Sequence, residues 1–117
     1  MNLPFDNLLF LIPSSSGIIF MLAGFIMLKF PPKKINGLYG YRTSSSMRNQ
    51  ERWDFSQRYS SIEMIKLGAL LTLSSIFGLI FKPDGIIGMF LGLTLMIIMV
   101  VFLSIRVERA IKNKFTN

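Results

Sequence analysis

The chain has no cysteine and no histidine among its 117 residues. Without Cys it can form no disulfide and offers no thiol nucleophile, and without His it has no imidazole for a metal or for general-base catalysis. Acidic residues are also few, and they are scattered along the chain: Asp6, Glu51, Asp54, Glu63, Asp84 and Glu108. We therefore predict no metal site, no cofactor and no catalytic residue, and we do not expect an enzyme.

Charge of either sign is scarce. Only 16% of the residues are charged, whereas 51% are hydrophobic. A soluble domain of this size cannot bury so much apolar surface, so a soluble helical bundle is a poor alternative to a membrane protein. No carboxylate is expected deep in the membrane, which also disfavours an ion-coupled transporter.

The apolar residues gather in three long stretches that carry little or no charge. A bilayer core of about 30 Å takes about 20 helical residues. The second stretch is long enough only if Glu63 and Lys66 lie at the headgroup level, where long side chains can reach water. We predict an all-α membrane protein, a single membrane domain over residues 1–117, with transmembrane helices at about 7–30, 62–81 and 85–105.

The basic residues are unevenly distributed and predict the orientation. Of the 13 Lys and Arg residues, none precedes Lys29, and only Lys82 lies between the second and third spans. The others fall in the first loop with its flanks and in the tail after Ile105. The positive-inside rule places both segments in the cytoplasm and the N-terminus outside, in a multi-pass protein of the cytoplasmic membrane. The first span has no basic segment before it, so we interpret it as an anchor and not a secretory signal peptide.

The formal net charge of +7 suits attraction to anionic lipid headgroups, worth about 1 kcal/mol for each well-placed Lys or Arg. Direct nucleic-acid binding is a weaker interpretation, because the charges lie within reach of the membrane. Gly88 and Gly92 form a GxxxG pair, which favours close helix packing within the chain or in a homo-oligomer, with a ligand groove as the alternative. Pro13 either kinks the first helix or marks its start.

A polar stretch at residues 31–57 separates the first two spans. Pro31 and Pro32 end the first helix, because proline lacks an N–H and clashes with the preceding turn. Lys33 and Lys34 follow as headgroup contacts. Residues 39–43 read Tyr-Gly-Tyr-Arg-Thr, a combination suited to an interface where rings lie among headgroups and the guanidinium meets a phosphate or carboxylate.

A short amphipathic helix is predicted at 47–61, with the serines at 44–46 as its N-cap. Asp54 and Arg58 have the spacing of an i,i+4 ion pair. Its apolar face consists of Met47, Phe55, Tyr59 and Ile62. Its opposite face consists of Ser46, Asn49, Trp53, Gln57 and Ser60. Two interpretations stay open: an interfacial anchor, or a recognition face that docks on residues 39–43 or on a partner.

Twelve residues of this region resemble the signature of the SdpI/YfhL family of bacterial membrane proteins. They are Ile35, Asn36, Tyr39, Gly40, Tyr41, Arg42, Thr43, Ser46, Met47, Asn49, Trp53 and Gln57. The flanking spans fit as well, and Ser56 is a mild departure because the family often has Ala there. With one span ahead of the signature, the chain looks like the short, single-unit members.

The resemblance implies protection. The family's namesake confers immunity to the sporulation-delaying (SDP) peptide toxin, which attacks the membrane, and holds a small DNA-binding repressor at the membrane. By this resemblance, the chain is expected to be an immunity or resistance protein whose signature residues form a binding surface without assigned chemistry. The alternative is that the chain, as a short member, keeps resistance without the repressor role.

Two other classes of function remain. One is lipid binding or lipid handling, with Arg42, Lys33 and Lys34 on a lipid phosphate and Asn49, Trp53 and Gln57 on the rest of the headgroup. A lipid-modifying enzyme stays open within this class, with Glu51, Asp54 and the two tyrosines as the available acid–base groups. The other is a structural subunit of a membrane complex. Toxin challenge of cells with and without the gene separates protection from both.

Overall fold

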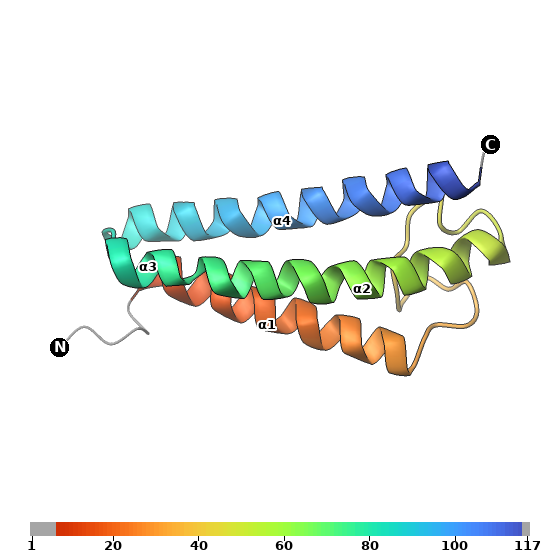
Figure 1. The fold of residues 1–117 in the computed structure, drawn as a ribbon, viewed down its shortest axis with the longest axis horizontal. Helices are drawn as coiled ribbons and strands as arrows, with labels where there is room; N and C mark the ends of the chain where they lie inside the picture. The colour runs from red at the N-terminus through yellow and green to blue at the C-terminus, as the bar shows by residue number, and fades with distance from the viewer. Residues whose placement is uncertain (1–6, 116–117) are drawn as a thin grey trace.

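The computed structural model describes residues 7–115, which form four helices arranged as an elongated antiparallel bundle (Figure 1). They are α1 (Leu8–Lys29), α2 (Gln50–Ser74), α3 (Ile76–Phe81) and α4 (Gly85–Lys114). Three stretches are long and apolar enough to cross a membrane: α1, the rod made by α2 and α3, and α4. The all-α class with three spans is therefore confirmed.

Helix α1 begins and ends where local chemistry directs it. Asn7 is the N-cap, and its side chain accepts a hydrogen bond from the N–H of Phe10. The helix ends at Lys29, just before Pro31 and Pro32. Pro13 lies inside the helix and does not mark its start.

Helix α2 corrects the prediction for the polar stretch. It runs from Gln50 to Ser74, so the predicted amphipathic helix and the start of the second span form one helix. Its N-cap is Asn49, whose side chain accepts a hydrogen bond from the N–H of Arg52 at 2.9 Å, and not the serines at 44–46. Met47 therefore lies outside the helix. The second span breaks at Ser75, and α3 carries it on to Phe81.

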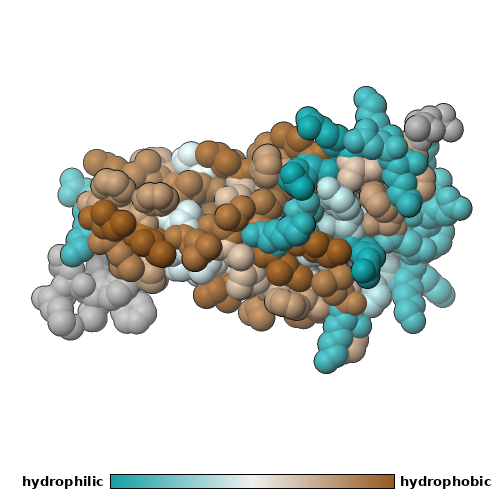
Figure 2. All heavy atoms as spheres, in the orientation of Figure 1, coloured by the Kyte–Doolittle hydropathy of each residue, from teal (hydrophilic) through white to brown (hydrophobic). Residues whose placement is uncertain are grey.

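The chain then reverses at Lys82, whose backbone is left-handed with φ of 43°. Helix α4 extends well beyond the predicted end at residue 105. Its 30 residues make a rod of about 45 Å, against about 30 Å for a bilayer core. The last turns of α4 therefore stand outside the apolar layer, beside the loop that joins α1 to α2. Figure 2 shows hydrophilic side chains gathered at that end and hydrophobic ones over most of the remaining surface.

Glycines allow the helices to approach closely. A Cβ on Gly17 of α1 would lie 2.5 Å from the carbonyl oxygen of Gly68 on α2, and a Cβ on Gly24 would lie 2.6 Å from that of Ser61. On α4, a Cβ on Gly92 would lie 3.0 Å from the Leu8 carbonyl oxygen, and Gly88 is buried nearby. The GxxxG face of α4 thus packs on α1 within the same chain.

Candidate functional site

One end of the bundle carries a structured cap that contains the signature residues. We call this the polar cap: the loop at 30–49, the first turns of α2 and the last turns of α4. Figure 1 shows this loop and the C-terminal end of α4 together at one end of the molecule. The tight turn between α3 and α4 lies at the other end.

Trp53 and Gln57 of α2 bind the backbone of the loop. Trp53 has 0% exposure, and its indole Nε1–H donates to the carbonyl of Pro32. Gln57 is 2% exposed and bonds the backbone of Tyr41 twice. Its Oε1 accepts from the Tyr41 N–H at 2.7 Å, and its Nε2 donates to the Tyr41 carbonyl at 2.7 Å. The Trp53 face therefore docks on the loop and is not an interfacial anchor.

Gly40 is placed where only glycine fits. Its φ is +107°, a conformation that residues with a side chain rarely adopt. A Cβ there would meet the Gln57 side-chain oxygen and would lie 2.8 Å from Cγ of Pro32. The glycine thus allows the loop backbone to pass directly over the Gln57 amide.

A compact turn follows Gly40. The Ser46 hydroxyl is fully buried, accepts from the Thr43 N–H at 2.8 Å and lies 3.2 Å from the Tyr41 carbonyl, to which it can donate. Ahead of Gly40, the Asn36 side chain accepts from the N–H groups of Leu38 and Tyr39 at 2.9 and 2.7 Å. Such side-chain bonds set turns without secondary structure.

Glu108 of α4 also binds the loop, through three hydroxyl groups. Its carboxylate accepts hydrogen bonds from the hydroxyls of Tyr41 at 2.6 Å, Thr43 at 2.9 Å and Ser45. Burial alone would raise the pKa of Glu108, but the three donors favour the carboxylate and leave its pKa below the usual value. Burial, with the bond to Glu108, raises the pKa of Tyr41 well above its ordinary value. Tyr41 therefore stays protonated and donates.

A direct contact between α2 and α4 is made by Arg106, two residues before Glu108. Glu63 is 3% exposed, and its Oε1 accepts from Nε and Nη2 of Arg106 at 2.9 and 2.7 Å. The predicted pair of Asp54 with Arg58 is not formed, because Asp54 instead accepts from Nε2 of Gln50 at 2.8 Å. The same Gln50 amide donates to the Lys33 carbonyl and so ties the loop to α2.

The signature residues fall into two groups. Buried or bonded members build the cap itself: Asn36, Gly40, Tyr41, Thr43, Ser46, Asn49, Trp53 and Gln57. Tyr39 belongs partly with them, because its hydroxyl donates to the Phe30 carbonyl at 2.7 Å while its ring stays accessible. Arg42 and Met47 are exposed and Ile35 is half-buried. Within residues 7–115, no acceptor bonds the Arg42 guanidinium.

Glu108 was missed by the sequence reasoning, and so was the pairing of Glu63 with Arg106. Glu108 is the one acidic residue in the basic tail after residue 105, and that was the available signal. Among the described residues, no group of three or more acidic residues could hold a metal. The cap instead exposes three cations, Lys33, Lys34 and Arg42, which suits recognition of anions.

Comparison with known proteins agrees with the membrane architecture and with the signature. The family model of the SdpI/YfhL protein family matches residues 33–114. The chain is also 44% identical over 55 residues to the uncharacterized protein YfhL of Bacillus subtilis (strain 168). That match covers 47% of the chain and about half the length of the relative, 50%. No solved structure matches the chain significantly.

Proposed function

Because the chain belongs to the SdpI/YfhL protein family, we propose that it is an integral membrane protein that protects a bacterial cell against a membrane-active peptide toxin of the SDP type. The family resemblance supplies the type of toxin. The three apolar helices support a site of action in the membrane, where such a toxin acts. The protein then works by binding and not by catalysis.

The exposure of Arg42 is the observation that assigns the proposed function to particular residues. The other strongly polar signature side chains are used to build the cap, whereas the Arg42 guanidinium is exposed on its surface. A planar guanidinium on a rigid support loses little freedom when it binds a carboxylate or phosphate. We assign Arg42 as the main contact of the cap with its partner, with Lys33 and Lys34 as supporting cations.

The experiment is a killing assay in a sensitive strain that expresses the protein. The wild-type chain is expected to protect, and Arg42→Lys is expected to make the cells about tenfold more sensitive, because Lys cannot form the bidentate contact. Arg109→Lys is the matched control, since Arg109 is also exposed at the same end of the molecule. Immunoblots of membranes must show equal amounts of each variant.

Two outcomes would contradict this assignment. If the wild-type chain gives no protection against any toxin of this class, the proposed function is wrong. If Arg42→Lys protects as well as the wild type, Arg42 is a generic headgroup contact and the functional surface lies elsewhere. A repressor held on the cap, a homo-oligomer or a larger membrane complex would each appear as a copurifying protein.

A further inference from the structure

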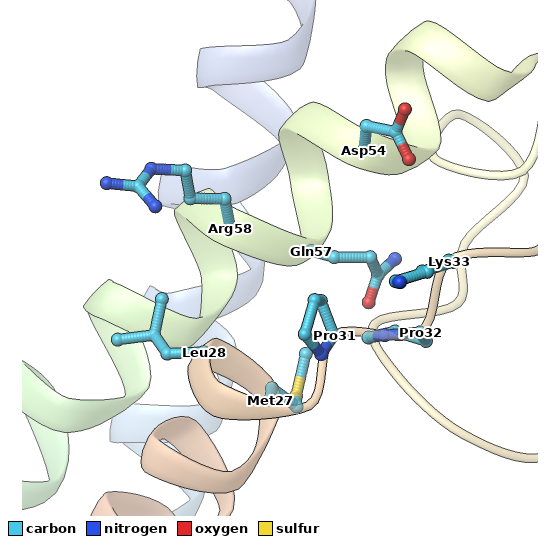
Figure 3. A pocket seen from close by; sticks show the side chains of 8 residues that line it. All are labelled: Met27, Leu28, Pro31, Pro32, Lys33, Asp54, Gln57 and Arg58. Atoms are coloured by element: carbon cyan, nitrogen blue, oxygen red, sulfur yellow. The ribbon is translucent and has the colours of Figure 1, made fainter.

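A cavity of about 270 Å³ lies between the end of α1, the start of the loop and α2 (Figure 3). It belongs to the side of the cap away from Glu108 and does not include Arg42. Its lining combines apolar and charged side chains: Met27, Leu28, Pro31, Pro32, Lys33, Asp54, Gln57 and Arg58. The contacts that build the cap use the Gln57 amide but leave most of the other polar groups accessible.

The charges around this cavity are of both signs and are not paired with one another. Asp54 and Arg58 are one turn apart on α2, where side chains are about 5–6 Å apart at Cβ. Asp54 is engaged by Gln50 through one carboxylate oxygen, and within residues 7–115 the Arg58 guanidinium has no bonding partner. Lys33 contributes a second cation from the loop, and Figure 3 shows its side chain directed toward Gln57, whereas the Arg58 guanidinium lies on the other side of Gln57 and points away from it.

The other wall of the cavity is apolar and is formed by the end of α1 and the first residues of the loop. Met27, Leu28 and Pro31 line it. Phe25 and Ile26, beside Met27 on α1, are 56% and 52% exposed, which is the usual state of a side chain that contacts lipid. The cavity thus lies where the apolar layer of the bundle meets the polar cap. A ligand that fits both walls has a charged head and an apolar tail.

We propose that this cavity binds one phospholipid whose headgroup carries a primary ammonium, of the phosphatidylethanolamine class. In this proposal its phosphate contacts Lys33 and is reached by Arg58 once that exposed side chain turns toward the cavity, its ammonium meets the free oxygen of Asp54, and an acyl chain follows α1 past Leu28. Cationic pockets between transmembrane helices are suited to lipid headgroups, and charged hydrogen bonds are the stronger ones. A purely anionic headgroup fits less well, because Asp54 would repel it.

The test compares phosphatidylethanolamine with phosphatidylcholine of the same acyl chains, bound to the purified full-length protein and measured by native mass spectrometry. The two lipids differ by three N-methyl groups, which remove the ammonium donors. Phosphatidylethanolamine is expected to bind at least about threefold more tightly, the effect of one partly exposed ion pair. Arg58→Gln is expected to weaken both lipids by a similar factor.

Asp54→Asn is the decisive variant, because Asn can still accept the hydrogen bond from Gln50. It is expected to abolish the preference for phosphatidylethanolamine while leaving the protein folded by circular dichroism. Glu51→Gln is the matched control, since Glu51 is an exposed carboxylate in the first turn of α2 and does not line the cavity. Arg58→Lys keeps the charge and is expected to retain binding. Weaker binding in Arg58→Gln can then be assigned to the lost charge and not to misfolding.

Equal binding of the two lipids would overturn the proposal, and so would tighter binding of phosphatidylglycerol. If Glu51→Gln lost the preference for phosphatidylethanolamine to the same extent as Asp54→Asn, the preference would depend only on the net charge of the cap. Binding of free phosphoethanolamine with the same affinity would show that the apolar wall contributes nothing. Lys33 belongs to both proposals, so protection is tested separately through Arg42, which does not line this cavity.

Discussion

Gln57 shows how a single side chain orders a long loop. Its amide forms with Tyr41 the reciprocal pair of bonds that one strand residue forms with another, although no strand is present among residues 7–115. Gln57 is buried, so the loss of either bond leaves a polar atom of its amide unmet, at about 1–3 kcal/mol. Trp53 adds a third bond to the same loop, through Pro32.

A substitution at Gly40 tests whether the backbone conformation of this residue is needed for the loop to dock. Gly40→Ala is expected to destabilise the docked loop by about 1–3 kcal/mol, because Ala is strained at φ of +107° and its Cβ meets Gln57 and Pro32. The chain has one Trp, which is buried against the loop, so a red shift of its fluorescence measures undocking.

Gly37→Ala is the matched control, since a Cβ on Gly37 would have nothing within 4 Å. It should leave the emission of Trp53 unchanged. A similar red shift in both variants would mean that the loop is sensitive to any change and that the backbone conformation of Gly40 has no special part in docking.

The polar cap depends on helix α4 continuing past the membrane. Had α4 ended at residue 105, neither Arg106 nor Glu108 would stand on a rigid helix opposite α2 and the loop. Two nearby residues of α4 make carboxylate contacts at this end of the bundle: Arg106 with Glu63, and Glu108 with the loop hydroxyls. The helix is therefore both a membrane span and a wall of the cap.

The lowered pKa of Glu108 predicts a pH dependence of loop docking. A carboxyl whose pKa falls on folding stabilises the folded state above its unfolded pKa, about 4.3 for Glu, and loses that contribution as the pH falls through the lower folded value. Acidification from pH 7 to about 3 should therefore loosen the loop and shift the fluorescence of Trp53 to the red.

Glu108→Gln separates this effect from the other carboxyls. The variant should show part of the red shift already at pH 7, because Gln accepts the three hydroxyls less strongly, and its change on acidification should be smaller. If wild type and variant respond identically to pH, the protonation of Glu108 does not control docking.

The whole molecule is organised by the bilayer as its solvent. Large apolar side chains stay exposed along the spans, among them Ile86 at 70% and Phe90 at 60% on α4, because lipid covers them. The loop and the end of α4 lie together at the basic end of the molecule, and the turn that contains Asp84 lies at the opposite end (Figure 1).

The expected orientation, with the cap in the cytoplasm, can be tested directly because the chain has no Cys. Single cysteines at Lys34, Asp84 and Lys112, all exposed positions, would be treated in intact cells with a membrane-impermeant thiol reagent. Only Asp84→Cys should be labelled from outside, and the other two only after the cells are opened. Labelling of Lys112→Cys in intact cells would reverse the orientation.

The features that the sequence predicted correctly depend on local chemistry or on length. A long apolar run needs only its own composition to become a span, so the three spans were predictable, except for the residues at which they end. Pro31 and Pro32 stop α1 through their own rings. The signature residues were also identified by their spacing, although the role of each was not.

The tertiary structure decided everything that depends on how the helices pack. Serines at 44–46 and Asn49 are all good N-caps, and the docked turn around Ser46 left Asn49 to begin α2. Asp54 bonds Gln50 and not Arg58, because Gln50 is held between Asp54 and the Lys33 carbonyl. Glu108 meets Tyr41 across 67 positions of sequence. No local pattern encodes such a contact, because it exists only once three helices and a loop have been brought to the same end of the bundle.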